Sequence, residues 1–263
     1  MLITGPSGLS FHARKWKIGD RRNLRDRNIT KQGLLLKKML EVVDEGIEDP
    51  GPYTFLEQGK PGVWNKISIP DILDSLIDIR ISTKPILDYN ESCAQCGAKI
   101  PLSIDLRDLI RAPMSDIGKG HLSSGIPIET ILPCEDKNGD EAEAKVKVRF
   151  LLGEDMPKLT KYYQKDPALM EEAQQVLHMA EISVPWIPEP LKSVNAIWDF
   201  YKDQPWEFQS GLEDFVAKIS GGVDTKVETD CPRCHMEQTS VIPFGVEFFY
   251  PQKSSSISSM GML

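Results

Sequence analysis

The chain of 263 residues has no apolar run long enough to cross a bilayer, and its N-terminus lacks a charged stretch followed by a long hydrophobic one. We therefore expect a protein with no membrane segment or secretion signal that is made in a cytoplasm. Its net charge of −8 provides no broad positive field of the kind that sequence-independent phosphate binding requires. This charge disfavours nucleic acid as the main partner.

Motifs of the common catalytic classes are also missing. The GPSG of residues 5–8 lacks the Lys-Ser/Thr of a phosphate-binding loop, and no G-x-G-x-x-G follows a strand. The chain has four histidines, at His12, His121, His178 and His235. They form no H-E-x-x-H pattern, and no G-x-S-x-G is present. Acidic pairs such as Glu154 and Asp155 suit a solvated face or a helix start. The sequence therefore predicts a non-enzymatic protein.

Cysteine is scarce, but its spacing is informative. A cytoplasm keeps thiols reduced, so the five cysteines are expected to be ligands, catalytic groups or core residues rather than disulfides. Four of them form two C-x-x-C pairs, each followed by a polar turn and an alternating strand, which is the pattern of a zinc knuckle. Two knuckles complete a closed tetrahedral shell around a structural Zn²⁺. The predicted ligands are Cys93, Cys96, Cys231 and Cys234.

Other interpretations of these pairs remain open at this stage. The CPRCH of residues 231–235 matches the attachment pattern of c-type haem, which is installed outside the cytoplasm. A thioredoxin-like redox pair would open a helix, whereas both pairs here precede strand-like sequence. Unrelated core thiols are a third possibility, and each pair could instead share a metal with a second subunit. Cys134 has no obvious mate and is interpreted as a small buried residue.

The residue that follows each pair bears on the knuckle turn. Gly97 follows Cys96 and suits a turn that needs positive φ. His235 holds the matching place after Cys234. Because four cysteines already close the shell, His235 is interpreted as a bystander or as an outer-shell donor rather than a ligand.

Hydrophobic periodicity predicts a mixed α+β fold. Helical spacing predicts helices over residues 33–45, 70–82, 167–180, 193–203 and 211–220. Alternation predicts strands over residues 100–109, 126–133 and 145–152, the last two forming a hairpin around the DKNGDE turn.

Three regions follow from these elements. Residues 1–32 are predicted to be a basic arm, either solvated, docked on an acidic partner or in contact with RNA. Residues 33–251 form the body, with a split zinc ribbon (93–106 and 226–247) and a helical lobe at about 153–222. The ribbon joins the first third of the chain to the C-terminus. Residues 252–263 are a Ser-rich tail that is expected to be flexible.

Several segments appear in a characteristic order: ISIPDILDSLIDIRIS, CAQCG, KVRFLLGEDM, VDTKVETDCPRCHMEQTSVIP and FFYP. In this order the chain resembles the T4-like phage baseplate hub and hub-assembly proteins of contractile tails. The positions that match the family pattern are Cys93, Cys96, Cys231, Cys234, Arg149, Leu151, Phe248, Phe249 and Pro251. The chain departs from that pattern at His235, where a glycine is common.

The resemblance implies a non-enzymatic structural component of a contractile phage tail baseplate, in the hub or next to it. Such a protein is made in the host cytoplasm, lies in the virion tail baseplate and contacts other baseplate and tail-hub proteins. We hypothesise that the basic arm and the FFYP segment dock into these neighbours. The alternatives are an assembly chaperone absent from the mature virion, a zinc-ribbon nucleic-acid-binding adaptor and a thiol oxidoreductase.

Overall fold

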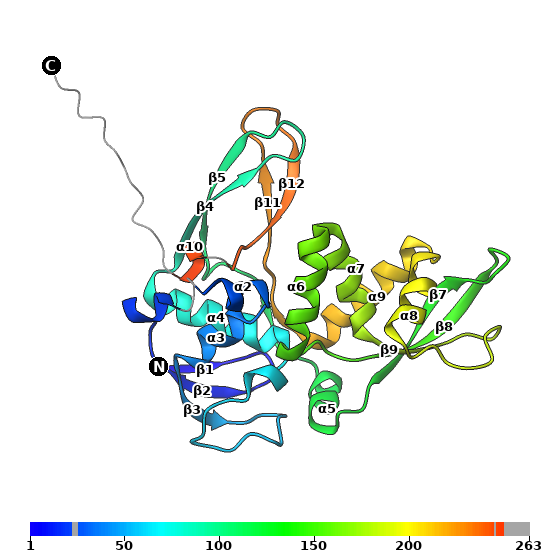
Figure 1. The fold of residues 1–263 in the computed structure, drawn as a ribbon, viewed down its shortest axis with the longest axis horizontal. Coiled ribbons are helices and arrows are strands. Elements are labelled where there is room, and N and C mark those ends of the chain that lie inside the picture. The colour runs from blue at the N-terminus through cyan, green and yellow to red at the C-terminus, as the bar shows by residue number, and fades with distance from the viewer. Residues whose placement is uncertain (23–25, 245, 250–263) are drawn as a thin grey trace.

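A computed structural model describes residues 1–22, 26–244 and 246–249 of the chain (Figure 1). The fold mixes helices and strands, as predicted. The α-helices are α2 Arg27–Lys31, α3 Leu35–Glu41, α4 Ile69–Thr83, α5 Asp116–Ser124, α6 Met156–Lys165, α7 Pro167–His178, α8 Val194–Lys202, α9 Trp206–Ser220 and α10 Val246–Phe249. Short 3₁₀ turns are η1 Ile18–Asp20, η2 Trp64–Lys66 and η3 Gly153–Asp155. The predicted Ser-rich tail, residues 252–263, lies outside the described residues.

Within the residues that the structure describes, the strands form five small sheets. Three-stranded antiparallel sheets are formed by β1 Leu2–Thr4, β2 Ser10–Ala13 and β3 Asp44–Asp49, and by β7 Ile128–Glu135, β8 Glu141–Val148 and β9 Met179–Ser183. Two-stranded pairs are formed by β4 Ile86–Ser92 with β5 Lys99–Asp105, by β11 Lys226–Asp230 with β12 Glu237–Val241, and by β6 Arg111–Ala112 with β10 Gly222–Val223.

The first lobe is built on the β1–β2–β3 sheet with helices α3 and α4, and its core includes side chains between residues 3 and 16. This part of the predicted basic arm over residues 1–32 is therefore packed into the body, whereas most of residues 17–22 and 26–32 are exposed. Strands β1 and β2 pair with each other and with β3, and Phe11 is fully buried, with its ring edge-on to Trp64 at 4.8 Å. Trp16 is also buried and its indole N–H donates to the Met39 carbonyl at 3.1 Å. The Lys and Arg residues begin at Arg14, whereas the buried apolar residues before it lie on or beside two paired strands, which the charge pattern did not reveal.

Helix α3 is shorter than predicted. The helical pattern continued to residue 45, but the helix ends at Glu41 and Asp44 begins β3. The Asp44 carboxylate accepts N–H groups from Gly46 at 2.8 Å and Gly62 at 2.5 Å, and the Trp64 indole at 2.9 Å. These contacts, together with pairing to β2, hold residues 44–49 in an extended form that local periodicity could not reveal.

Helix α4 follows its prediction closely. The Ser68 hydroxyl accepts the Asp71 N–H, Pro70 occupies the first turn, and the apolar face is fully buried. Asp71 is buried as well, and it accepts the Tyr53 hydroxyl, the Ser68 hydroxyl at 2.9 Å and the Ser7 N–H at 3.1 Å. Ser7 lies in the GPSG turn, so this turn fixes the β1–β2 hairpin on the start of α4.

The second lobe is built on the β7–β8–β9 sheet and helices α7, α8 and α9. The predicted hairpin is confirmed, with Ile128 opposite Val148 and Glu135 opposite Glu141. Several boundaries differ from the prediction: β7 spans residues 128–135 instead of 126–133, β8 begins at Glu141 instead of residue 145, and α9 begins at Trp206 instead of residue 211. Strand β8 ends at Val148 instead of residue 152, and α7 ends at His178, so that Ala180 lies in β9. The predicted helical lobe therefore contains a sheet strand that pairs with β8 and shares the core beneath the helices.

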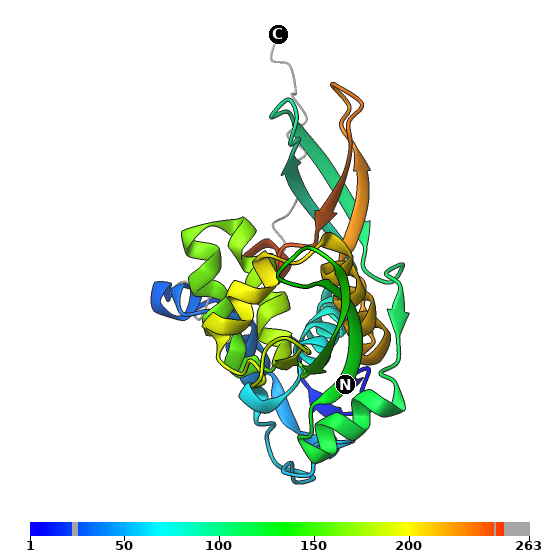
Figure 2. The same cartoon turned by 90° about the vertical axis from the view of Figure 1, so that its right-hand side faces the viewer.

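The chain passes from the first lobe into the second and then returns to the first. Strand β6 on the outward path pairs with β10 on the return path, Arg111 opposite Val223 and Ala112 opposite Gly222. Two hairpins flank this crossing, β4–β5 before it and β11–β12 after it. They stand side by side and project from the body in both views (Figure 2). We call this pair of hairpins the projecting arm.

The end of the described chain is anchored in the first lobe. Phe248 and Phe249 are both buried, and the Phe249 ring meets the Trp16 ring edge-on at 5.0 Å. This differs from the hypothesis that the FFYP segment docks into a neighbouring protein, because both phenylalanine rings are buried in the chain's own core. Pro251 lies outside the described residues.

Candidate metal centre

The two C-x-x-C pairs lie in the turns at the far ends of the two hairpins. Cys93 and Cys96 lie between β4 and β5, and Cys231 and Cys234 lie between β11 and β12. In the first turn the Gly97 N–H donates to the Cys93 carbonyl at 2.9 Å. In the second, the His235 N–H donates to the Cys231 carbonyl at the same distance. The two turns therefore share one hydrogen-bond pattern.

Both turns place a residue at positive φ after the second cysteine. Gly97 has φ of 66° and His235 has φ of 58°. Among the described residues other than glycine, His235 is the only one with positive φ. Histidine thus adopts the left-handed conformation that the first knuckle gives to glycine, at some cost in strain.

The fold brings the four sulfur atoms together from positions far apart in the sequence. The Sγ atoms of Cys93 and Cys234 lie 3.6 Å apart, as do those of Cys96 and Cys231, and all four lie within 4.8 Å of one another. Four sulfurs at about 2.3 Å from a tetrahedral Zn²⁺ stand about 3.8 Å apart. The cluster therefore has the dimensions of a single-ion site, and all four cysteines come from one chain.

The surroundings favour the thiolate at Cys93 and Cys231 but the thiol at Cys234. Cys93 and Cys231 are buried. The N–H of Cys234, helped by that of Arg233, lowers the pKa of Cys231 to about 6, and the N–H of Cys96 lowers the pKa of Cys93. The pKa of Cys234 is raised to about 12, in spite of the Met236 N–H, by burial and by the neighbouring sulfurs. A cation would remove this conflict, because it stabilises all four sulfurs as thiolates.

Few other contacts join the tips of the hairpins. Ile100 is buried against the cysteines, with Ala98 and Leu102 partly buried beside it. Gln238 of β12 reaches across to the first knuckle, where its amide oxygen accepts the Ala94 N–H at 3.0 Å and its amide nitrogen donates to the Ser92 carbonyl at 3.4 Å. Because β4–β5 and β11–β12 are separate sheets, the sulfur cluster is the main link at this end.

Four sulfur donors limit which metal or redox group the site can hold. Tetrahedral sulfur ligation is typical of zinc and of iron–sulfur centres, but sulfurs this close together leave no room for several irons. The position of both pairs in hairpin turns disfavours a redox pair at a helix start. His235 is not part of the four-residue cluster. What the structure shows is a possible four-cysteine metal site.

No family model, curated protein or solved structure matches this chain. None of the helices described for the chain has the length and apolar character needed to span a membrane.

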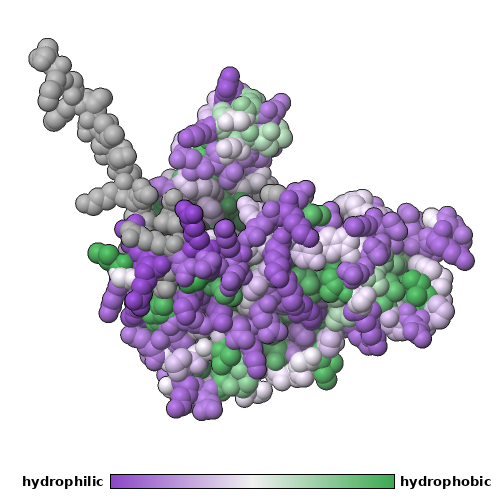
Figure 3. Space-filling model, in the orientation of Figure 1, coloured by the Kyte–Doolittle hydropathy of each residue, from purple (hydrophilic) through white to green (hydrophobic). Residues whose placement is uncertain are grey.

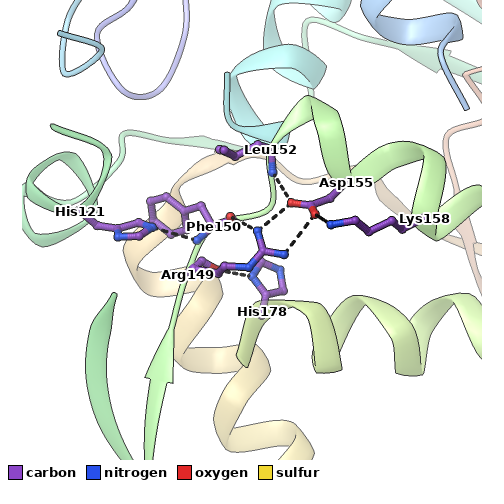
Figure 4. A network of polar contacts seen from close by, with 7 residues as sticks. All are labelled: His121, Arg149, Phe150, Leu152, Asp155, Lys158 and His178. Carbon is purple, nitrogen blue, oxygen red and sulfur yellow. Dashed lines mark hydrogen bonds and ion pairs between the residues drawn. The ribbon is translucent and has the colours of Figure 1, made fainter. Parts of the chain in front are cut away.

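The structure also reveals a buried polar network that the sequence patterns did not predict (Figure 4). Asp155 is almost fully buried at the start of α6. Its carboxylate accepts hydrogen bonds from the two terminal guanidinium nitrogens of Arg149 at 2.7 and 3.1 Å, from the Lys158 ammonium at 2.8 Å and from the Leu152 N–H at 3.1 Å. Burial acts to raise the pKa of Asp155, but the bonds from Arg149 and Lys158 outweigh it and lower that pKa to about 2.

Two buried histidines complete the network from either side. The Nδ1 of His178 donates to the Arg149 carbonyl at 2.9 Å, and the Nε2 of His121 accepts the Phe150 N–H at 3.1 Å. Burial lowers the pKa of His178 to about 4. The charged groups are paired with one another and with the backbone, which is the arrangement of a structural clamp. The KVRFLLGEDM segment carried the only signal, an arginine followed six residues later by an aspartate.

Proposed function

We propose that this chain is a non-enzymatic structural component of a contractile phage tail baseplate, in the hub or next to it, held together by one Zn²⁺. The zinc ligands are Cys93, Cys96, Cys231 and Cys234. The protein is made in the host cytoplasm, and its partners are other baseplate and tail-hub proteins. The assignment to a baseplate rests on the order of motifs along the chain.

One observation carries the structural role: cysteines 135 or more residues apart meet at the tip of a projecting arm. Structural zinc sites contribute about 10–16 kcal/mol to folding in small peptides, which rivals the stability of a whole domain. One ion therefore suffices to hold the two hairpins as one rigid body. A rigid arm standing out from the body is suited to docking into a neighbouring protein.

The surface of the arm argues against the nucleic-acid adaptor. A hollow of about 660 Å³ on the β11–β12 hairpin is lined by Glu228, Thr229, Asp230, Glu237, Gln238 and Thr239. Three of these side chains are carboxylates, which repel a phosphate backbone. Proteins that offer basic or polar groups are better partners for this face.

The proposal is tested in the phage that encodes the chain, by replacing Cys96 and Cys231 with serine together. Mature particles lacking intact baseplates are expected, because the two hairpins are no longer joined. Replacing Cys134 with serine is the matched control, because this buried cysteine lies outside the cluster.

Proteomic analysis of purified wild-type particles decides between the structural protein and the alternative of an assembly chaperone. Detection of the chain in the tail supports the structural protein. An assembly defect in the double variant, combined with the absence of the chain from wild-type particles, would instead identify a chaperone. Normal particles in the double variant would contradict both.

A further inference from the structure

A groove of about 600 Å³ runs beside α6, away from the cysteines. We call it the α6 groove. Its lining residues are Arg149, Lys158, Lys161, Tyr162, Gln164, Lys165, Leu177 and Val194. Four of these residues are cations and none is a carboxylate, although the whole chain carries a net charge of −8. On the face of the molecule that Figure 3 shows, hydrophilic side chains gather over α6, near the middle of the view.

The positive charge of the groove is only partly neutralised by the protein. Asp155 pairs with Arg149 and Lys158. Lys161 and Lys165 are exposed and form no ion pair with a carboxylate among the residues that the structure describes. Lysines three and four residues apart on one helix face repel each other. An anion bound in the groove would relieve this repulsion.

The groove also offers apolar and aromatic surface. The Tyr162 ring stacks on Trp198 of α8, with centroids 5.1 Å apart and planes at 23°. The Lys165 ammonium lies 6.0 Å from the Tyr162 ring, and the Lys202 ammonium lies 5.6 Å from the Trp198 ring. The groove and the helix beside it therefore combine aromatic surface with positive charge, a combination that suits a ligand with carboxylates alternating with apolar groups.

The extent of the charge favours a short ligand. Helix α6 has ten residues, about 15 Å of helix, and acidic residues stand at both of its ends, Glu154 before it and Asp166 after it. A nucleic-acid strand is charged along its whole length, so its phosphates would meet Glu154 or Asp166 wherever it left the groove. A peptide can instead confine its acidic residues to the stretch between these two carboxylates. Lys31, whose carbonyl accepts the Gln164 amide at 2.7 Å, adds positive charge near the C-terminal end of the helix.

From these observations we infer that the α6 groove binds an acidic peptide segment of a partner protein. Carboxylates of the segment pair with Lys161 and Lys165, and an apolar side chain packs against Tyr162 and Leu177. The inference adds a second docking surface to the proposed structural role, but it rests on different residues from the metal centre.

The test measures binding of a short fluorescent peptide, glutamates interrupted by single leucines, to the full chain by fluorescence anisotropy. We expect saturable binding that weakens with salt, and about a tenfold loss of affinity in the double variant Lys161→Glu and Lys165→Glu. The control is Lys137→Glu with Lys145→Glu, two exposed lysines outside the groove with the same change in net charge. The control is expected to keep the affinity of the wild type.

Three results would overturn the inference: no saturable binding by the wild type, equal losses in the two double variants, or tighter binding of an oligothymidylate than of the peptide. Circular dichroism verifies that each variant is folded. Zinc content is measured on the same samples and is expected to be the same in all of them. A failure of the groove therefore remains distinct from a failure of the metal centre.

Discussion

At the scale of single residues, His235 is a strained substitute for glycine. Its φ of 58° matches the 66° of Gly97 in the other knuckle, and β-branched side chains tolerate this region worst. We predict that His235→Gly keeps the metal and stabilises the chain by up to about 1 kcal/mol, since the left-handed conformation costs other residues about that much. His235→Val is predicted to release the metal at a lower concentration of chelator.

Chelator titration with thermal unfolding of both variants measures these effects. The prediction would be wrong if glycine weakened metal binding as much as valine does. That result would mean that the imidazole of His235 contributes to the site through more than its backbone.

His178 makes stability depend on pH. Its pKa is lowered by burial to about 4, whereas an exposed histidine titrates near 6.5. Between these values the unfolded chain binds a proton that the folded chain excludes, so stability falls as the pH drops. The expected loss from pH 7.5 to 5 is about 2 kcal/mol for this residue.

His178→Asn retains an N–H near the position of Nδ1 and cannot titrate, so it should remove this part of the pH dependence. The control, His12→Asn, changes a histidine whose side chain is 52% exposed and should retain the full slope. Urea unfolding at both pH values measures the difference, and metal release in acid affects all three chains alike. If the free energy of unfolding fell equally with pH in the wild type and in His178→Asn, the His178 imidazole would not be buried in its neutral form.

At the scale of elements, we predict that the projecting arm depends on the proposed metal far more than the two lobes do. Without the sulfur cluster, the small apolar group around Ile100 and the bonds of Gln238 are left to join the tips. We predict that Cys231→Ser speeds amide exchange in β4–β5 and β11–β12 by at least about tenfold. Protection of α4 and of the β7–β8 hairpin should change little.

Hydrogen exchange followed by mass spectrometry, with Cys134→Ser as the control, resolves these regions. Uniform loss of protection across both lobes would contradict a local role for the metal. It would show instead that the whole fold forms only after the metal binds.

The elements that the sequence predicted well are those fixed by nearby residues. Ser68 and Pro70 mark the start of α4, and the two C-x-x-C spacings mark the knuckles. Strands β3 and β9 were missed because the helical spacing of apolar residues runs on into them, through Val43 and Ala180. What makes them strands is pairing with β2 and β8, which no local pattern contains.

The sequence also left open whether the two cysteine pairs meet within one chain or share a metal with a second subunit. Spacing identified the four cysteines, but only the fold shows that Cys93 faces Cys234 and Cys96 faces Cys231. The Arg149–Asp155 clamp was missed because a salt bridge between the end of a strand and the start of a helix has no periodic signal.

At the scale of the whole molecule, the chain closes on itself at two places, the sulfur cluster and the aromatic contacts of its C-terminal helix. Phe249 packs between Trp16 and Phe248, with ring centroids 5.0 and 5.2 Å away. We predict that Phe249→Ala lowers the free energy of unfolding by about 3–5 kcal/mol, as expected for a large cavity in a core.

Tyr163→Ala, which removes a ring that is 53% exposed, should cost less than about 0.5 kcal/mol. Urea unfolding followed by tryptophan fluorescence measures both. A small loss for Phe249→Ala would mean that α10 contributes little to the first lobe.

We propose that one zinc ion joins sulfur atoms from the first third and from the C-terminal part of the same chain. X-ray absorption at the zinc edge of the purified full chain tests it most directly. We expect one zinc per chain, with four sulfur neighbours at about 2.3 Å. A chain that purifies without zinc, or a zinc with nitrogen or oxygen among its nearest neighbours, would contradict it.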